Sequence, residues 1–116
     1  MAALLEKLRD IGCDIDGAMP RFLNNEDFYI KCLKKFVADD VFEHLQETLK
    51  SNQVEESFKH AHNLKGVCAN MGITPIQDII FDMVEVLRGG EIPVDGLEKI
   101  NSIIEIRDKI KEYLNE

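Results

Sequence analysis

Apolar residues recur along the chain at intervals of three and four positions, the spacing that places them on one face of an α-helix. No stretch of strand length alternates strictly between apolar and polar residues with hairpin turns at its ends. The predicted helices run from Ala2 to about Ile11, from Asn25 past Phe36, from Asp39 or Asp40 to Leu49, from Gln53 to Met71, from Thr74 to Gly89 and from Asp95 to Leu114. A brief helical turn, capped by Asp14 or Asp16, is expected through Ala18 and Phe22.

Residues with strong positional preferences mark the ends of these helices. Asn25 is a good N-cap, and Thr74-Pro75 supplies a cap and a proline at the first helical position. Gly72 and Gly89-Gly90 are placed to end helices, and Asp95 is expected to cap the last one. Four helices of about three turns or more, with short connections, predict an antiparallel four-helix bundle carrying additional short N-terminal helices. The fold class is therefore all-α, with one domain over residues 1–116.

Composition and charge limit the classes of partner that the protein can bind. The chain has 116 residues, of which 45% are hydrophobic, a balance typical of a globular domain rather than a disordered one. The formal net charge of -8 repels phosphate backbones and anionic lipids, which argues against nucleic acid or a membrane as partner. No apolar run approaches the ~20 residues that a spanning helix needs. We expect a cytoplasmic protein that is most simply monomeric.

The sequence assigns no functional role to the three cysteines. Cys13, Cys32 and Cys68 are odd in number and show no CxxC spacing, so they suggest neither a disulfide framework nor a zinc site. Each is expected to behave as a small apolar residue in a reducing compartment.

The segment from His60 to Gly72 carries the candidate chemistry. One face of its helix is apolar and is expected to be the core side, with Val54, Phe58, Ala61, Leu64, Cys68 and Met71. His62 projects from the margin of that face, where solvent should reach its imidazole. His60, two residues earlier, points to a different side, which argues against a metal site made of these two histidines.

Two neighbours of His62 make the position unusual. Gly66 lies one turn later on the same side, followed by Ala69, and a mid-helix glycine costs about 1 kcal/mol relative to alanine. Either Gly66 opens space for a bulky partner to reach His62, or it permits close packing of another helix. Lys65 stands three residues after His62, a spacing that can place its ammonium beside the imidazole.

This arrangement suits a covalent phosphoryl carrier. Neutral imidazole is nucleophilic near pH 7 and can hold a group on a ring nitrogen. A phosphoryl group brings about two negative charges, which Lys65 could partly neutralise. The sequence offers no glycine-rich phosphate loop and no Mg²⁺ carboxylate cluster around His62. It therefore lacks the residues needed to transfer a phosphoryl group from ATP. We expect no kinase activity and no metal or cofactor of its own.

The segment resembles the signature of the histidine-containing phosphotransfer (HPt) domains of multistep two-component signalling. That signature has an apolar residue two positions after the histidine, then lysine and glycine, and often a second glycine at the tenth position. Leu64, Lys65, Gly66 and Gly72 match every one of these positions after His62. The helical plan of the family covers essentially the whole chain.

The resemblance implies a phosphorelay intermediate. His62 would accept a phosphoryl group from the aspartyl phosphate of a receiver domain and pass it to another receiver, with a hybrid sensor histidine kinase upstream. The receiver would supply Mg²⁺, Lys65 would stabilise the phosphate, and Gly66 would give access. Gly72 would shape the turn after the helix. The residues implied in docking are Lys59, Asn63, Ala69 and Asn70.

One position departs from the family pattern. Many members carry a Gln or Glu on the next helix, 12 residues after the second glycine, which bonds the other ring nitrogen of the histidine. That count reaches Val84 here, with Glu85 beside it. Either the register is shifted by the Thr74-Pro75 start, or the imidazole is oriented differently.

Two other functions remain open from the sequence. The domain can be a non-catalytic interaction module that binds receiver or kinase domains without modification of His62. Alternatively, His44, His60 and His62 can serve a small metal-binding or enzymatic domain.

Overall fold

The computed structural model describes residues 2–116 and confirms the all-α prediction, because that range holds helices and no strand. The elements are α1 (Ala2–Asp10), α2 (Ile15–Ala18), the 3-10 helix η1 (Met19–Phe22), α3 (Glu26–Ala38), α4 (Val41–Lys50), α5 (Val54–Met71), α6 (Thr74–Arg88) and α7 (Gly96–Leu114). No helix within residues 2–116 is both long and apolar enough to cross a membrane.

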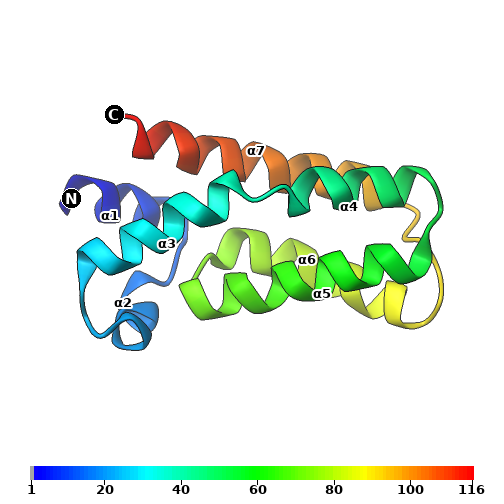
Figure 1. Ribbon diagram of the computed structural model, residues 1–116, viewed down its shortest axis with the longest axis horizontal. Helices are drawn as coiled ribbons and strands as arrows, with labels where there is room; N and C mark the ends of the chain where they lie inside the picture. Colours follow the sequence, from blue (N-terminus) through cyan, green and yellow to red (C-terminus); the bar gives the residue numbers. More distant parts are fainter. Residues whose placement is uncertain (1) are drawn as a thin grey trace.

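Helices α4 to α7 form the bundle. Each packs on the next along the chain, and α7 returns to pack on α4, which closes the ring of contacts. Consecutive helices run in alternating directions along the long axis, which measures 41 Å (Figure 1). Helix α3 leads into α4 at nearly the same level of the molecule and packs on α7, while α1 also lies against α7 (Figure 1). The N-terminal elements thus extend the bundle at the end where α5 finishes.

The core is mostly aliphatic, in keeping with a chain that has six Phe, two Tyr and no Trp. On α5, the predicted core face is confirmed from the middle of the helix to its end, because Ala61, Leu64, Cys68 and Met71 are buried. Val54 and Phe58, also expected on that face, are only partly buried. Both lie nearer the start of α5, and Phe58 has a second set of neighbours that is described below.

Two of the predicted N-caps are confirmed. The side chain of Asn25 accepts a hydrogen bond from the backbone N–H of Phe28 at 3.0 Å at the start of α3. Asp14, rather than Asp16, caps α2 by accepting from the N–H of Gly17 at 3.1 Å. Each cap satisfies a backbone donor that has no partner inside its helix.

At two other helix starts the predicted side-chain cap does not form, although Asp95 does hold the predicted cap position. Ile73 holds the cap position of α6, and Thr74 is its first helical residue, with its hydroxyl directed at the carbonyl of Gly72 at 3.4 Å. Asp95 holds the cap position of α7 but makes no capping hydrogen bond, and its carboxylate lies 3.5 Å from Nζ of Lys99. In both cases a partner within four residues takes the polar side chain.

The C-terminal end of α5 is closely tied to the N-terminal elements. Gly72 ends the helix with φ 72°, and its N–H donates to the carbonyl of Cys68. The hydroxyl of the buried Tyr29 donates to the carbonyl of Met71 at 2.7 Å, and burial raises the pKa of that hydroxyl. The N–H of Asp14 donates to the carbonyl of Gly72 at 2.8 Å. Carbonyls that a helix end leaves open are therefore satisfied here.

Arg21 completes this arrangement from η1. Its Nε donates to the carbonyl of Asn70 at 2.8 Å, and one terminal nitrogen donates to the carbonyl of Ala69 at 3.0 Å. A guanidinium at a helix C-terminus also interacts favourably with the helix dipole. The last turn of α5 is fixed by residues from α2, η1 and α3.

Candidate functional site

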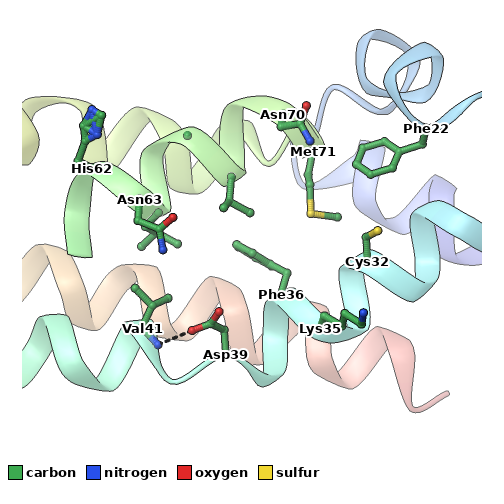
Figure 2. Close-up of a pocket in the computed structure, with 13 residues that line it drawn as sticks. Phe22, Cys32, Lys35, Phe36, Asp39, Val41, His62, Asn63, Asn70 and Met71 are labelled. Carbon is green, nitrogen blue, oxygen red and sulfur yellow. Dashed lines mark hydrogen bonds between the residues drawn. The ribbon is translucent and has the colours of Figure 1, made fainter. Parts of the chain in front are cut away.

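His62 lies on α5 with its side chain exposed, as the sequence predicts. It stands at one end of a surface pocket of about 670 Å³, with Phe22 and Cys32 at the other end (Figure 2). The pocket is lined by Phe22, Cys32, Lys35, Phe36, Asp39, Val41, His62, Asn63, Leu64, Gly66, Val67, Asn70 and Met71. An exposed imidazole at the edge of an open pocket can be reached by a macromolecular partner.

The two walls of this pocket differ in origin. Helix α5 supplies one wall, and the other comes from α3 and the junction between α3 and α4 (Figure 2). Phe36 and Val41 give that second wall apolar surface, and Lys35 and Asp39 place opposite charges on it. Asp39 also accepts a hydrogen bond from the N–H of Val41 at 2.8 Å, which fixes the turn between the two helices.

Gly66 faces open space. A Cβ atom added at this position would meet nothing within 4 Å outside its own helix. The alternative that Gly66 permits close packing of another helix is therefore wrong. The missing side chain leaves the surface next to His62 clear. This favours the other alternative, in which Gly66 opens space for a partner to approach the imidazole.

Among residues 2–116, the Lys65 ammonium packs on an aromatic ring and makes no hydrogen bond to the imidazole. Its Nζ lies 4.6 Å from the centroid of the Phe81 ring, on α6. Phe81 is about half exposed, and the face of an exposed aromatic ring attracts an ammonium. The flexible four-carbon stem of lysine permits other positions, so the placement of the ammonium beside a modified His62 stays a prediction.

The remaining predicted site residues lie in three different settings. Asn63 and Asn70 line the pocket with His62. Lys59 and Ala69 are exposed but lie outside the pocket lining, and Lys59 is 3.4 Å from a carboxylate oxygen of Glu56. Gly72 is buried at the turn after α5, where its backbone carbonyl pairs with Asp14. Its place in the structure fits a turn residue rather than a docking residue.

Sequence reasoning missed an aromatic neighbour of His62 and the arginine that packs on that neighbour. The Phe58 ring lies with its centroid 5.5 Å from that of the imidazole, and the guanidinium carbon of Arg88 lies 5.2 Å from the Phe58 centroid. Phe58 stands four residues before His62, a spacing that places both on one side of a helix. That signal was available, but assigning Phe58 to the core concealed it. The contact with Arg88, on α6, has no local signal.

The position expected to orient the imidazole holds no polar group. Val84 is fully buried in the core. Glu85 points elsewhere, with Oε2 lying 3.7 Å from Nε of Arg88. Within residues 2–116, neither nitrogen of the His62 imidazole has a hydrogen-bond partner.

The three histidines are not brought together. The rings of His44 and His60 stack between α4 and α5, with centroids 5.7 Å apart, and Nε2 of His44 lies 3.1 Å from a carboxylate oxygen of Asp40. His62 instead lies at the pocket (Figure 2). No group of three or more His, Cys, Asp or Glu side chains among residues 2–116 is arranged to hold a metal ion.

The three cysteines should differ sharply in reactivity. Burial raises the pKa of Cys13 to about 11 and that of Cys68 to about 12, so little thiolate forms at pH 8. Cys32 is only half-buried and lines the pocket. We expect iodoacetamide to modify Cys32 at least about tenfold faster than the other two, because the thiolate is the reacting species. Peptide mass spectrometry after timed alkylation measures this, and equal rates at all three would contradict the burial described.

Comparison with known proteins identifies the family to which this site belongs. The family model described as the Hpt domain matches residues 37–115, well over half of the chain. No curated protein and no solved structure matches the chain. Hpt domains are helical bundles that act in phosphotransfer in two-component signalling, where they interact with receiver domains and histidine kinases. With its helical bundle and its match over residues 37–115, the chain belongs to the Hpt domain family.

Proposed function

We propose that His62 is the phosphoacceptor of a phosphorelay intermediate, taking the phosphoryl group from a receiver aspartyl phosphate and passing it to another receiver. The observation that carries the proposal is the exposed His62 imidazole beside the open surface at Gly66, on the edge of a pocket. Other histidines of the chain lack such a setting, since His44 and His60 stack on each other.

The transfer is a nucleophilic displacement at phosphorus. The lone pair of the unprotonated imidazole nitrogen forms an N–P bond as the P–O bond to the receiver aspartate breaks. That electron pair leaves with the aspartate, which becomes a carboxylate, and the second imidazole nitrogen keeps its proton. The reverse displacement, by the carboxylate of a second receiver, regenerates free His62.

The chain contributes position and charge to this step. Gly66 leaves the approach to His62 free of side chains. Lys65 rests over Phe81 in this structure and, on its flexible stem, can swing toward a phosphoryl group on His62. We propose that the receiver supplies Mg²⁺ for charge neutralisation, and that this chain contributes no metal or cofactor of its own.

The pocket is the proposed docking surface for the receiver. Its apolar part includes Phe36 and Val67, and Asn63 and Asn70 offer hydrogen-bonding groups at the α5 wall. Apolar surface with a few polar groups is the composition that protein interfaces use at their centres. Lys59 and Ala69, exposed outside the pocket, are proposed as peripheral contacts of the same interface.

A transfer assay tests the proposal. Receiver domains carrying radiolabelled aspartyl phosphate are mixed with the protein, and the label on the protein is followed over time and located by peptide mass spectrometry. We expect label on His62 that is lost in acid and stable in base, as for a phosphoramidate. Binding of receivers without any label on the protein would instead favour an interaction module that is never phosphorylated.

A larger side chain at Gly66 should block the transfer without harming the fold. Leucine is a better helix former than glycine, so Gly66→Leu should fold at least as well, but its side chain fills the space beside His62. Overpacking of about 1–3 kcal/mol at the interface corresponds to a loss of transfer of about five- to 150-fold.

The matched control for Gly66→Leu is Gly66→Ala, which adds one methyl group and also favours the helix. The control should transfer much faster than the leucine variant in the same radiolabel assay. Equal, wild-type rates for both variants would show that a partner does not approach His62 over Gly66.

A further inference from the structure

The orientation of the His62 ring calls for an explanation, because no hydrogen bond from residues 2–116 holds either imidazole nitrogen. Val84 stands at the register where a polar side chain was expected and is 0% exposed. Glu85, its neighbour, is directed at Arg88 rather than at His62. Neither of these two α6 residues therefore orients the imidazole through a hydrogen bond.

The His62 imidazole instead packs against an aromatic side chain. The partly buried Phe58 lies one turn before His62 on α5, with ring centroids 5.5 Å apart and planes inclined by 54°. This lies within the range in which aromatic rings attract one another in tilted geometries. Arg88 reaches from the end of α6 to within 5.2 Å of the Phe58 centroid, and its Nε lies 3.7 Å from Oε2 of Glu85.

We infer that Phe58, held from α6 by Arg88, is a positioning residue for the His62 imidazole. This inference rests on the proposed function, in which His62 accepts the phosphoryl group. The Phe58 ring covers part of the imidazole and restricts its rotation, so fewer orientations must be lost when a receiver docks. Phe58 does not line the pocket, so it acts through the His62 imidazole rather than through a contact with the docked receiver.

The same contact favours the phosphorylated state. When one imidazole nitrogen carries the phosphoryl group and the other keeps its proton, the ring bears a positive charge. The face of an aromatic ring attracts such a charge. Arg88 serves this arrangement indirectly, because its guanidinium holds the Phe58 ring and is itself paired with Glu85.

The kinetic test compares Phe58→Leu with Phe58→Tyr. Leucine keeps apolar volume and favours a helix but has no ring, whereas tyrosine keeps the ring. With receiver at saturation, we expect the Leu variant to transfer about two- to tenfold more slowly, the worth of an aromatic pair. The Tyr variant should recover the wild-type rate. Affinity for the receiver should stay unchanged in both, because Phe58 lies outside the pocket lining.

Arg88 provides an independent check through a double-mutant cycle. Arg88→Gln should slow the transfer in the wild-type background and have no further effect in the Phe58→Leu background, because Arg88 acts through the Phe58 ring. Additive losses would overturn that route. Thermal unfolding of each variant confirms that the compared proteins are folded at the assay temperature.

A spectroscopic measurement separates this inference from the proposed function. In wild-type protein, the ring current of Phe58 should shift the C–H resonances of the His62 imidazole, and the shift should vanish in Phe58→Leu and persist in Phe58→Tyr. Unchanged resonances in Phe58→Leu, or equal rate losses in both variants, would overturn the positioning role. A Phe58-dependent shift without any phosphoryl uptake would overturn the phosphoacceptor role and leave the positioning intact.

Discussion

The His62→Gln variant is expected to fold normally and to take up no phosphoryl group above background. A carboxamide nitrogen has no available lone pair, so the glutamine side chain cannot form the N–P bond that the proposed transfer requires. His62 is exposed, and its imidazole nitrogens have no hydrogen-bond partner within residues 2–116. Glutamine is also a good helix former, so the change should cost little stability. Incubation with a labelled receiver, followed by electrophoresis, measures the uptake.

The chain offers matched controls for this variant. His60→Gln and His44→Gln remove the two other histidines, whose rings stack on each other away from the pocket. Both controls should take up label at close to the wild-type rate. Label remaining on His62→Gln, or label lost from His60→Gln, would show that His62 is not the phosphoacceptor.

The second large effect is expected on stability, from Gly72→Ala. Gly72 has φ 72°, a conformation that costs an L-residue about 1–2 kcal/mol. A Cβ here would also press on the carbonyl of Asp14 and lie 3.2 Å from Cβ of Ala18. Because the obstacle is backbone, relief requires α2 to move away from α5. We expect a total loss of about 2–5 kcal/mol, measured as the free energy of unfolding in urea.

Gly90→Ala separates the cost of backbone strain from the cost of the steric contact. Gly90 also has a positive φ, of 92°, but a Cβ there meets nothing within 4 Å. Its substitution should cost only the backbone strain, about 1–2 kcal/mol. The difference between the two variants measures the contact of Gly72 with the N-terminal elements. Equal losses would mean that α2 yields freely and that the end of α5 is less constrained than the hydrogen bonds indicate.

Local patterns were sufficient for the helices and for the exposure of the central histidine. The apolar spacing that predicts the core face of α5 also places His62 at its margin, because both follow from the same helical period. Gly72 was recognisable as a helix end, since few residues other than glycine adopt a left-handed conformation readily. The all-α fold follows from these local rules.

Features set by distant neighbours were not predictable in this way. Lys65 lies over Phe81 on the next helix, and nothing within a few residues of Lys65 signals that partner. The second wall of the pocket comes from α3, whose placement depends on how the whole chain packs. The caps expected from Thr74 and Asp95 failed for a local reason instead, because the Thr74 hydroxyl donates to Gly72 two residues earlier and the Asp95 carboxylate lies near Lys99 four residues later.

The hydrogen bonds from Arg21 and Tyr29 to the end of α5 affect how this domain can be moved between proteins. Both residues precede the span of residues 37–115 that the family model matches. A graft cut at those limits would carry His62 but leave carbonyls of the last α5 turn without their partners. It would also lose Phe22, Cys32, Lys35 and Phe36 from the pocket. A transplant that is to keep both the helix end and the docking surface should therefore begin before Asp14, whose backbone binds Gly72.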